Sequence, residues 1–166
     1  MAEVLLIERS DIVKYTPLDG NVDTDKFIQF VKIAQDIHIQ GSLGTDLLNK
    51  LKAEIEAGTL ADPYLSLLSS YVKPMLIHWS LVEYLPYAAY TVANKGVYKH
   101  TAESSTDVSK SEIDFLVEKQ RITAENYSQR FVDYMSFNQA SFPEYNTNSG
   151  ADVYPKHNSN IGGWYL

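Results

Sequence analysis

Two neighbouring segments of the chain, residues 24–40 and 43–57, carry apolar residues at helical spacing. In each segment the apolar positions recur every three or four residues, which places them on one face of a helix. Gln40 and Gly41 interrupt the pattern between the segments, and Gly58 is a typical C-terminal stop for the second helix. We therefore predict two helices that fold back on each other around a short glycine-containing corner. Their apolar faces consist of Phe27, Phe30, Val31, Ala34 and Ile37 in the first helix and Leu43, Leu47, Leu48, Leu51 and Ile55 in the second.

The sequence is most apolar between residues 75 and 92. Apolar side chains there occupy almost every side of a helix, and such a helix lies at the centre of a fold. Proline removes a backbone donor and clashes with the preceding turn, so Pro74 and Pro86 should bend this helix or divide it. We expect the helix to end at Gly96 and a polar surface loop to follow over residues 99–109.

The clearest helix start is the sequence Ser109-Lys110-Ser111-Glu112. The Ser109 and Glu112 side chains can each bind the backbone amide of the other residue, which is the pattern of a capping box. The residues that follow keep the helical spacing over about seven turns, and this predicts a helix roughly 40 Å long. Its apolar stripe consists of Ile113, Leu116, Val117, Ala124, Tyr127, Phe131, Tyr134 and Met135.

The two ends of the chain differ from this helical middle. Residues 1–22 contain a short apolar run followed by polar and turn-forming residues, which is typical of an extended arm. Residues 139–166 are rich in Asn, Ser, Gly, Pro and Tyr and show neither a helical nor a strand pattern. The sequence therefore predicts an all-α protein with a four- to five-helix bundle over residues 23–138, an extended N-terminal arm and a long irregular C-terminal tail.

The charge of the chain bears on nucleic-acid binding. The formal net charge is −7, whereas proteins that bind nucleic acid do so through clustered Lys and Arg. The corner near Gly41 resembles a DNA-reading helix-turn-helix in outline. However, the second helix begins Leu43-Gly44-Thr45-Asp46, and an aspartate at that place repels phosphate. A small helical regulatory or DNA-binding module remains the alternative to the function inferred below.

The sequence offers little that points to catalysis. The four histidines, His38, His78, His100 and His157, lie far apart without a partner at a metal-binding helical offset. Phosphate-binding loops, a G-x-S-x-G nucleophile motif and cysteine are all missing from the sequence. We expect no catalytic, cofactor-binding or metal-binding residues, and no membrane-spanning segment. An enzyme whose site is assembled from residues that the sequence does not pair is a third possibility.

The chain has more aromatic residues than one small core needs, with 12 Tyr, 6 Phe and 2 Trp. Tyr and Trp are enriched at protein interfaces because they bring a large contact area with a polar tip. We therefore expect the arm and the tail to bind partners, and residues 146–166 to become ordered only on contact with one. The expected partner-binding residues are Val4, Leu5, Leu6, Ile7, Phe142, Tyr145, Tyr154, Trp164, Tyr165 and Leu166.

Several short motifs resemble the head-to-tail connector (adaptor, or neck-ring) proteins of tailed bacteriophages, including those of crAss-like and related gut phages. In the first two helices these are Ala34-Gln35, Ile37, Ile39 and Leu43-Gly44 leading into Leu47-Leu48 and Leu51. The resemblance continues at Ala93-Asn94-Lys95-Gly96-Val97, at Arg121 with Ala124-Glu125 and Tyr127, and at Phe142-Pro143-Glu144-Tyr145. It covers most of residues 1–145.

The resemblance implies a structural virion protein without enzymatic activity. Such a subunit forms a homo-oligomeric ring, usually of twelve copies, that binds the portal protein on one side and a tail or second ring protein on the other. The protein would be assembled in the host cytoplasm and located at the portal–tail junction of the virion. DNA would pass through the ring without specific binding, and an acidic channel would repel its phosphates.

Overall fold

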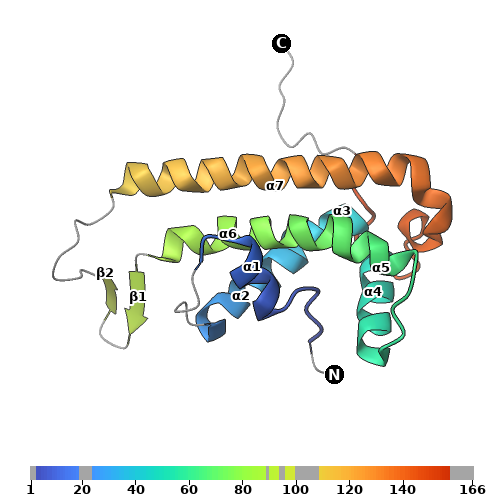
Figure 1. Ribbon diagram of the computed structural model, residues 1–166, viewed down its shortest axis with the longest axis horizontal. Coiled ribbons are helices and arrows are strands. Elements are labelled where there is room, and N and C mark those ends of the chain that lie inside the picture. The colour runs from blue at the N-terminus through green and yellow to red at the C-terminus, as the bar shows by residue number, and fades with distance from the viewer. Residues whose placement is uncertain (1–2, 19–23, 89, 94–95, 100–108, 158–166) are drawn as a thin grey trace, which may run out of the picture.

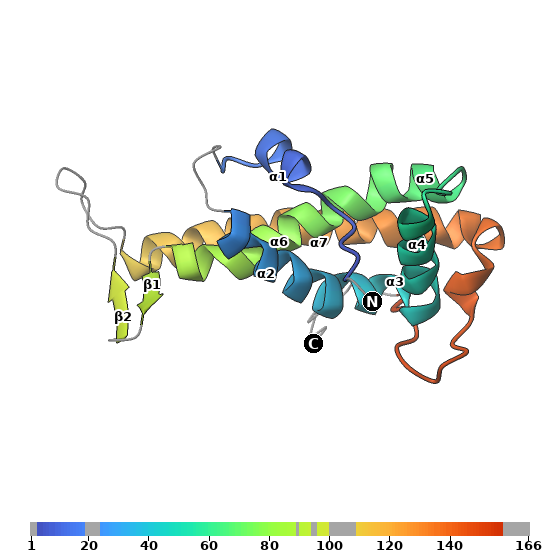
Figure 2. The ribbon, with the colours of Figure 1, turned by 90° about the horizontal axis from the view of Figure 1, so that it is seen from below.

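The computed structural model describes residues 3–18, 24–88, 90–93, 96–99 and 109–157. The fold is an elongated all-α bundle, as the apolar pattern predicts. Two long helices lie side by side along the longest dimension, shorter helices pack beneath them, and a small β-hairpin lies at one end (Figures 1 and 2).

The two long helices are α6 (Lys73–Ala88) and α7 (Lys110–Asn138), and they make the most extensive contact in the molecule. α6 is buried on nearly all sides, so the expected central helix is confirmed. α7 begins at the expected capping box, with the Glu112 amide donating to Ser109 Oγ at 3.3 Å and the Ser109 amide donating to Glu112 Oε2 at 2.8 Å.

The first predicted helix is continuous but not uniform. It consists of α2 (Thr24–Ala34), a π-helical segment (Gln35–Ile39) and α3 (Gln40–Leu43), and it packs against α6. The corner was expected at Gln40 and Gly41, but both lie within the helix. The turn falls at Gly44, whose φ of 78° suits glycine, and α4 (Thr45–Ala57) follows and ends at Gly58 with φ 66°.

The central region is one continuous run of helix from Tyr64 to Ala88. It consists of α5 (Tyr64–Leu67), a second π-helical segment (Leu68–Val72) and α6, so Pro74 lies inside the helix directly after the change from π-helical to α-helical backbone. The expected helix end at Gly96 is wrong. α6 ends at Ala88, and β1 (Tyr90–Ala93) pairs antiparallel with β2 (Gly96–Lys99). Tyr, Thr and Val in β1 and Val and Tyr in β2 favour extended backbone, which explains the difference.

The N-terminal segment was expected to be an extended arm without a helix, and the structure differs in part. Residues 4–7 lie on the bundle, with Leu6 and Ile7 buried, and a short helix α1 (Arg9–Tyr15) follows. The buried amide of Gln35 holds this segment: its Oε1 accepts from the Leu6 N–H at 2.9 Å, and its Nε2 donates to the Val4 carbonyl at 3.0 Å. The side chain thus satisfies two backbone groups of the arm, much as a neighbouring strand would.

The C-terminal segment is also part of the domain as far as residue 157. Two 3₁₀ turns, Gln139–Ser141 and Pro143–Asn146, lead into an irregular stretch that returns to the corner between α3 and α4. The amide of Thr45 donates to the Val153 carbonyl at 2.9 Å, and the amide of Lys156 donates to the Gly41 carbonyl at 3.0 Å. The expectation that this stretch needs a partner to become ordered is wrong for residues 146–157, because the chain supplies the surface itself.

Candidate functional site

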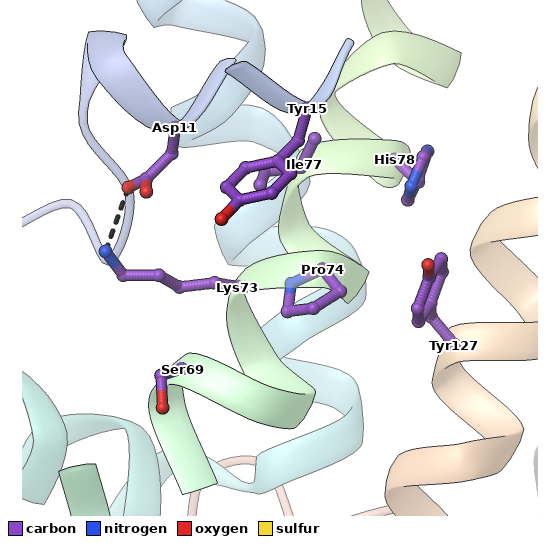
Figure 3. Close-up of a pocket in the computed structure, with 8 residues that line it drawn as sticks. All are labelled: Asp11, Tyr15, Ser69, Lys73, Pro74, Ile77, His78 and Tyr127. Atoms are coloured by element: carbon purple, nitrogen blue, oxygen red, sulfur yellow. Dashed lines mark hydrogen bonds and ion pairs between the residues drawn. The ribbon is translucent and has the colours of Figure 1, made fainter. Parts of the chain in front are cut away.

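A cleft of about 400 Å³ lies between α1, α6 and α7 (Figure 3). Its floor is formed by Lys73, Pro74, Ile77 and His78 of α6 and by Ser69 of the π-helical segment before it, while α1 and α7 form the two walls. Both walls present tyrosine rings, and the floor contributes proline and isoleucine carbons, so that the cleft is mainly aromatic and apolar. The lining residues are Asp11 and Tyr15 from α1, Ser69, Lys73, Pro74, Ile77 and His78 from the floor, and Tyr127 from α7.

An ion pair fixes the α1 wall. Lys73 Nζ donates to Asp11 Oδ2 at 2.9 Å, and the Glu8 amide donates to the same oxygen at 3.0 Å. Burial raises the pKa of the Asp11 carboxyl, but these hydrogen bonds outweigh burial, and the pKa lies below its usual value. The ammonium group of Lys73 is thus paired within the chain. The apolar and aromatic part of the lining consists of Tyr15, Pro74, Ile77 and Tyr127.

A stacked pair forms the α7 side of the cleft. The ring of His78 lies parallel to that of Tyr127, with centroids 5.0 Å apart and an interplanar angle of 6°. Gln120 forms a hydrogen bond with His78 Nδ1, and burial lowers the pKa of this histidine. Because a neutral imidazole stacks well on a phenol ring, the wall is flat and apolar at neutral pH.

A second histidine cluster lies on the other side of α6. His38 of the π-helical segment stacks on Trp79, with centroids 3.8 Å apart, and its Nε2 lies 2.8 Å from Glu83 Oε1. Trp79 Nε1 donates to Ser128 Oγ of α7 at 2.9 Å. Burial lowers the pKa of His38 and the nearby Glu83 carboxylate opposes that shift only partly. The cluster ties the π-helical segment Gln35–Ile39, α6 and α7 together.

The chemistry of the cleft suits binding more than bond breaking. Its charged groups form a closed ion pair, and its histidine already has a hydrogen-bond partner and a stacking partner. Within the described part of the chain, no group of three or more His, Asp or Glu side chains is arranged to hold a metal ion. A cleft with two aromatic walls, whose charged side chains are paired with each other, accommodates an apolar or aromatic ligand group.

Large apolar side chains are also exposed outside the cleft. The clearest are on the outer face of α7, where Phe115 is 70% and Phe137 is 90% exposed. A single exposed phenylalanine is common on a protein surface. Several exposed large apolar side chains on one molecule indicate contact with another surface. The other exposed large apolar residues are Val13, Tyr15, Ile28, Ile33, Ile37, Leu65, Tyr87, Leu116, Ile122 and Tyr154.

Comparison with known proteins places the chain in a family. A protein-family model, described as a family of unknown function (DUF6712), matches residues 39–155. The chain belongs to the DUF6712 family. No curated protein and no solved structure gives a significant match to this DUF6712 protein. The matched region contains the floor and the α7 wall of the cleft, whereas α1 lies before it.

The structure separates the residues expected to bind partners into three groups. Leu6, Ile7, Phe142 and Tyr145 are buried in the DUF6712 protein's own core and leave no side-chain surface for a partner, which corrects the expectation for them. Val4 and Leu5 are half-buried beside Gln35, and Tyr154 is exposed. Trp164, Tyr165 and Leu166 lie outside the described residues.

The start of α4, considered above as a DNA-reading helix, is covered by the chain itself. The Asp46 carboxylate accepts from Thr147 Oγ1 at 2.6 Å, from the Ser149 amide at 2.9 Å and from Ser149 Oγ at 3.0 Å. Pro155 lies against Gly44 in the same corner. A recognition helix must bring the start of its second helix to the base edges, and here the C-terminal segment occupies that position.

The cleft itself was not predicted, because α1 was interpreted as an extended arm. The signal was present: Glu8 and Asp11 have capping-box spacing, and Lys14 follows in the last turn. The exposed phenylalanines were also predictable, since neither Phe115 nor Phe137 belongs to the apolar stripe of α7. In the described residues, no helix is both long enough and apolar enough to cross a membrane.

Proposed function

We propose that this DUF6712 protein is a structural virion protein that forms a ring between the portal and the tail of a tailed phage. About twelve copies would surround the channel through which DNA leaves the head. The observation that carries the proposal is the set of large apolar side chains exposed on several different faces of one small domain.

Different faces matter because of symmetry. A subunit that contacts its neighbours through two distinct surfaces forms a ring or a filament, whereas a symmetric dimer uses one surface twice. Ile28, Ile33 and Ile37 are exposed on the helix that begins with α2, while Phe115 and Phe137 are exposed on α7. These helices lie on opposite sides of α6 (Figure 1). Such a placement supports head-to-tail association.

The interior of the domain supports a structural role. α6 and α7 are held together by a dense core and by the Trp79–Ser128 hydrogen bond, and both chain ends are fastened to the bundle as far as they are described. A ring that withstands passage of a genome needs rigid subunits. The net charge of −7, multiplied over a ring, would make the channel repel phosphates at distances within the Debye length.

The proposal is tested by the mass of the full chain in solution. Native mass spectrometry and negative-stain imaging, alone and with the portal protein of the same phage, should give a closed ring with a fixed copy number. A chain that remains monomeric under both conditions contradicts the proposal. A monomer or dimer that binds duplex DNA at physiological salt supports instead the DNA-binding module.

A further inference from the structure

We propose that Phe137 of one copy inserts into the cleft between α1, α6 and α7 of the next copy. This inference rests on the proposed ring and names one of its subunit contacts. It commits to a second copy of this chain as the occupant of the cleft, because the chain itself presents both a protruding aromatic side chain and an aromatic hollow.

Phe137 is the protruding group. It is 90% exposed near the C-terminal end of α7, and it is the most exposed large apolar side chain among the described residues. It does not fill its own cleft: the nearest cleft residue on the same helix, Tyr127, lies ten residues away, or about 15 Å along the axis. Burial of a phenylalanine ring on association removes a large apolar area from water, so an exposed one is a strong candidate for a contact.

The cleft fits such a ring. Its volume of about 400 Å³ lies in the range of about 300–1,000 Å³ for pockets that hold a small ligand. The rings of Tyr15 and Tyr127 face it from opposite walls, with Pro74 between them on the floor (Figure 3). An inserted phenyl ring would make edge and face contacts with both tyrosines. Tyr15 is itself 57% exposed, so one contact would cover exposed apolar surface on both copies.

Charge complementarity favours the same pairing. Asp133 lies one turn before Phe137 and is the only charged residue between Phe131 and Phe142. On the rim of the cleft, Lys14 is exposed and its Nζ lies 5.2 Å from the centroid of the Tyr15 ring. The other charged groups of the lining, Asp11 and Lys73, neutralise each other. A copy that inserts Phe137 therefore brings the Asp133 carboxylate towards a rim on which Lys14 carries an exposed ammonium group.

The first experiment compares two phenylalanines of one helix. Phe137→Ser should raise the concentration needed for assembly by about tenfold to a hundredfold, as expected for an aromatic anchor in a pocket. Phe115→Ser changes the same residue type, 70% exposed near the other end of α7, and should leave this contact intact. The inference is wrong if Phe115→Ser disrupts assembly and Phe137→Ser does not.

A mixing experiment tests whether the contact is head-to-tail. Ser69→Trp places a bulky ring in the cleft from an exposed position on its floor, so that this variant keeps Phe137 but has a filled cleft. Each variant alone should be monomeric, while an equal mixture of Phe137→Ser and Ser69→Trp should give a heterodimer and nothing larger. Two variants that stay monomeric when mixed, or that assemble separately, overturn the inference.

A charge exchange provides a readout that does not depend on packing. Asp133→Lys and Lys14→Glu should each weaken assembly, and the double variant should recover most of the loss, because the opposite charges again face each other. Circular dichroism of each variant checks that it is folded. Losses that simply add in the double variant contradict the pairing.

These outcomes separate the inference from the proposed function. If the wild-type chain forms no ring alone or with the portal protein, the proposed function fails. If the wild-type ring forms, and Phe137→Ser, Ser69→Trp, Asp133→Lys and Lys14→Glu each assemble like it, the ring stands and the Phe137 contact is wrong.

Discussion

Two pairs of aromatic residues in the C-terminal half of the chain have opposite environments. Phe142 and Tyr145 follow α7 in a segment of low helical propensity, yet they are only 0% and 2% exposed and pack edge-on against Tyr64 and Phe131. Phe115 and Phe137 belong to the most regular helix of the molecule, yet they are among its most exposed side chains.

The comparison shows that the regularity of the backbone around a residue does not determine whether its side chain is buried. A residue in an irregular segment is buried when the segment returns to the core, and this segment returns to the corner at Gly44. A residue in a helix is exposed when it lies opposite the stripe that packs. The aromatic side chains of α7 that are available for contact with another surface are therefore Phe115 and Phe137, which lie outside its apolar stripe.

The largest expected difference is in the free energy of unfolding, between substitutions of two phenylalanines of α7 of which one is buried and the other exposed. Phe131 is buried against Tyr145, so Phe131→Ala should lower the free energy of unfolding by about 3–5 kcal/mol. Phe137→Ser should change it by no more than about 0.5 kcal/mol, since the side chain is exposed. Urea denaturation at a protein concentration below assembly measures both. Equal losses of unfolding free energy in the two variants would contradict the assignment of Phe131 to the core and Phe137 to the surface.

The buried position of the C-terminal segment depends on Gly44. A Cβ there would lie 2.6 Å from Pro155 Cδ, and the φ of 78° is itself unfavourable for other residues. Gly44→Ala should lower the free energy of unfolding by about 2–4 kcal/mol. Gly58→Ala is the comparison: its backbone is left-handed helical, with φ 66° and ψ 25°, which other residues tolerate better than the φ 78° and ψ 160° of Gly44, and nothing lies within 4 Å, so only about 1–2 kcal/mol should be lost. Similar losses at both glycines would argue against the contact with Pro155.

The N-terminal segment is a second irregular stretch that is buried, and Gln35 tests why. Gln35→Ala leaves the Leu6 amide and the Val4 carbonyl without their partner, which should cost about 2 kcal/mol. It should also make residues 3–18 more accessible to protease. Gln29→Ala, on the exposed side of α2, removes only a bond to the Lys26 carbonyl and should have little effect. Unchanged proteolysis in Gln35→Ala would show that the arm is held by other contacts.

The smallest effect is a pH dependence of the buried cluster beneath the cleft. An unfolded histidine titrates near its ordinary pKa of about 6.5, and burial lowers the pKa of His38 in the fold, against the opposing effect of Glu83. Arg121 and Lys156 lower it further. The folded chain then binds fewer protons than the unfolded chain, so stability is full above pH 6.5 and falls as the pH drops below it.

His38→Phe is the variant that isolates this effect, because it keeps a ring against Trp79 and removes the titrating group. Denaturation at pH 7.5 and pH 5.5 should show a smaller loss on acidification in the variant than in the wild-type protein. His78, whose pKa burial also lowers, should contribute the remaining slope. An identical slope in both proteins would remove His38 from the explanation.

Much of the helical frame was predictable from the apolar pattern. The positions of α4 and α7, the central burial of α6 and the role of Gly58 as a helix end all follow from periodicity and capping residues. Local signals of this kind depend on neighbours within a few residues.

The cleft and the buried ends were not predictable in the same way. They arise from pairs that are distant in sequence, such as Gln35 with Leu6, Asp11 with Lys73 and Gly44 with Pro155. The β-hairpin was missed because its Tyr, Thr and Val residues continue the apolar character of α6. The exposure of Phe137 could have been predicted from the sequence, because this residue lies outside the apolar stripe of α7.

The most direct test of the central claim is the mass of the particle formed by the full wild-type chain together with the portal protein of its phage. Native mass spectrometry should give one ring of fixed copy number, with a mass that is an integer multiple of the chain mass above that of the portal. A chain that stays monomeric beside an intact portal ring would contradict the account.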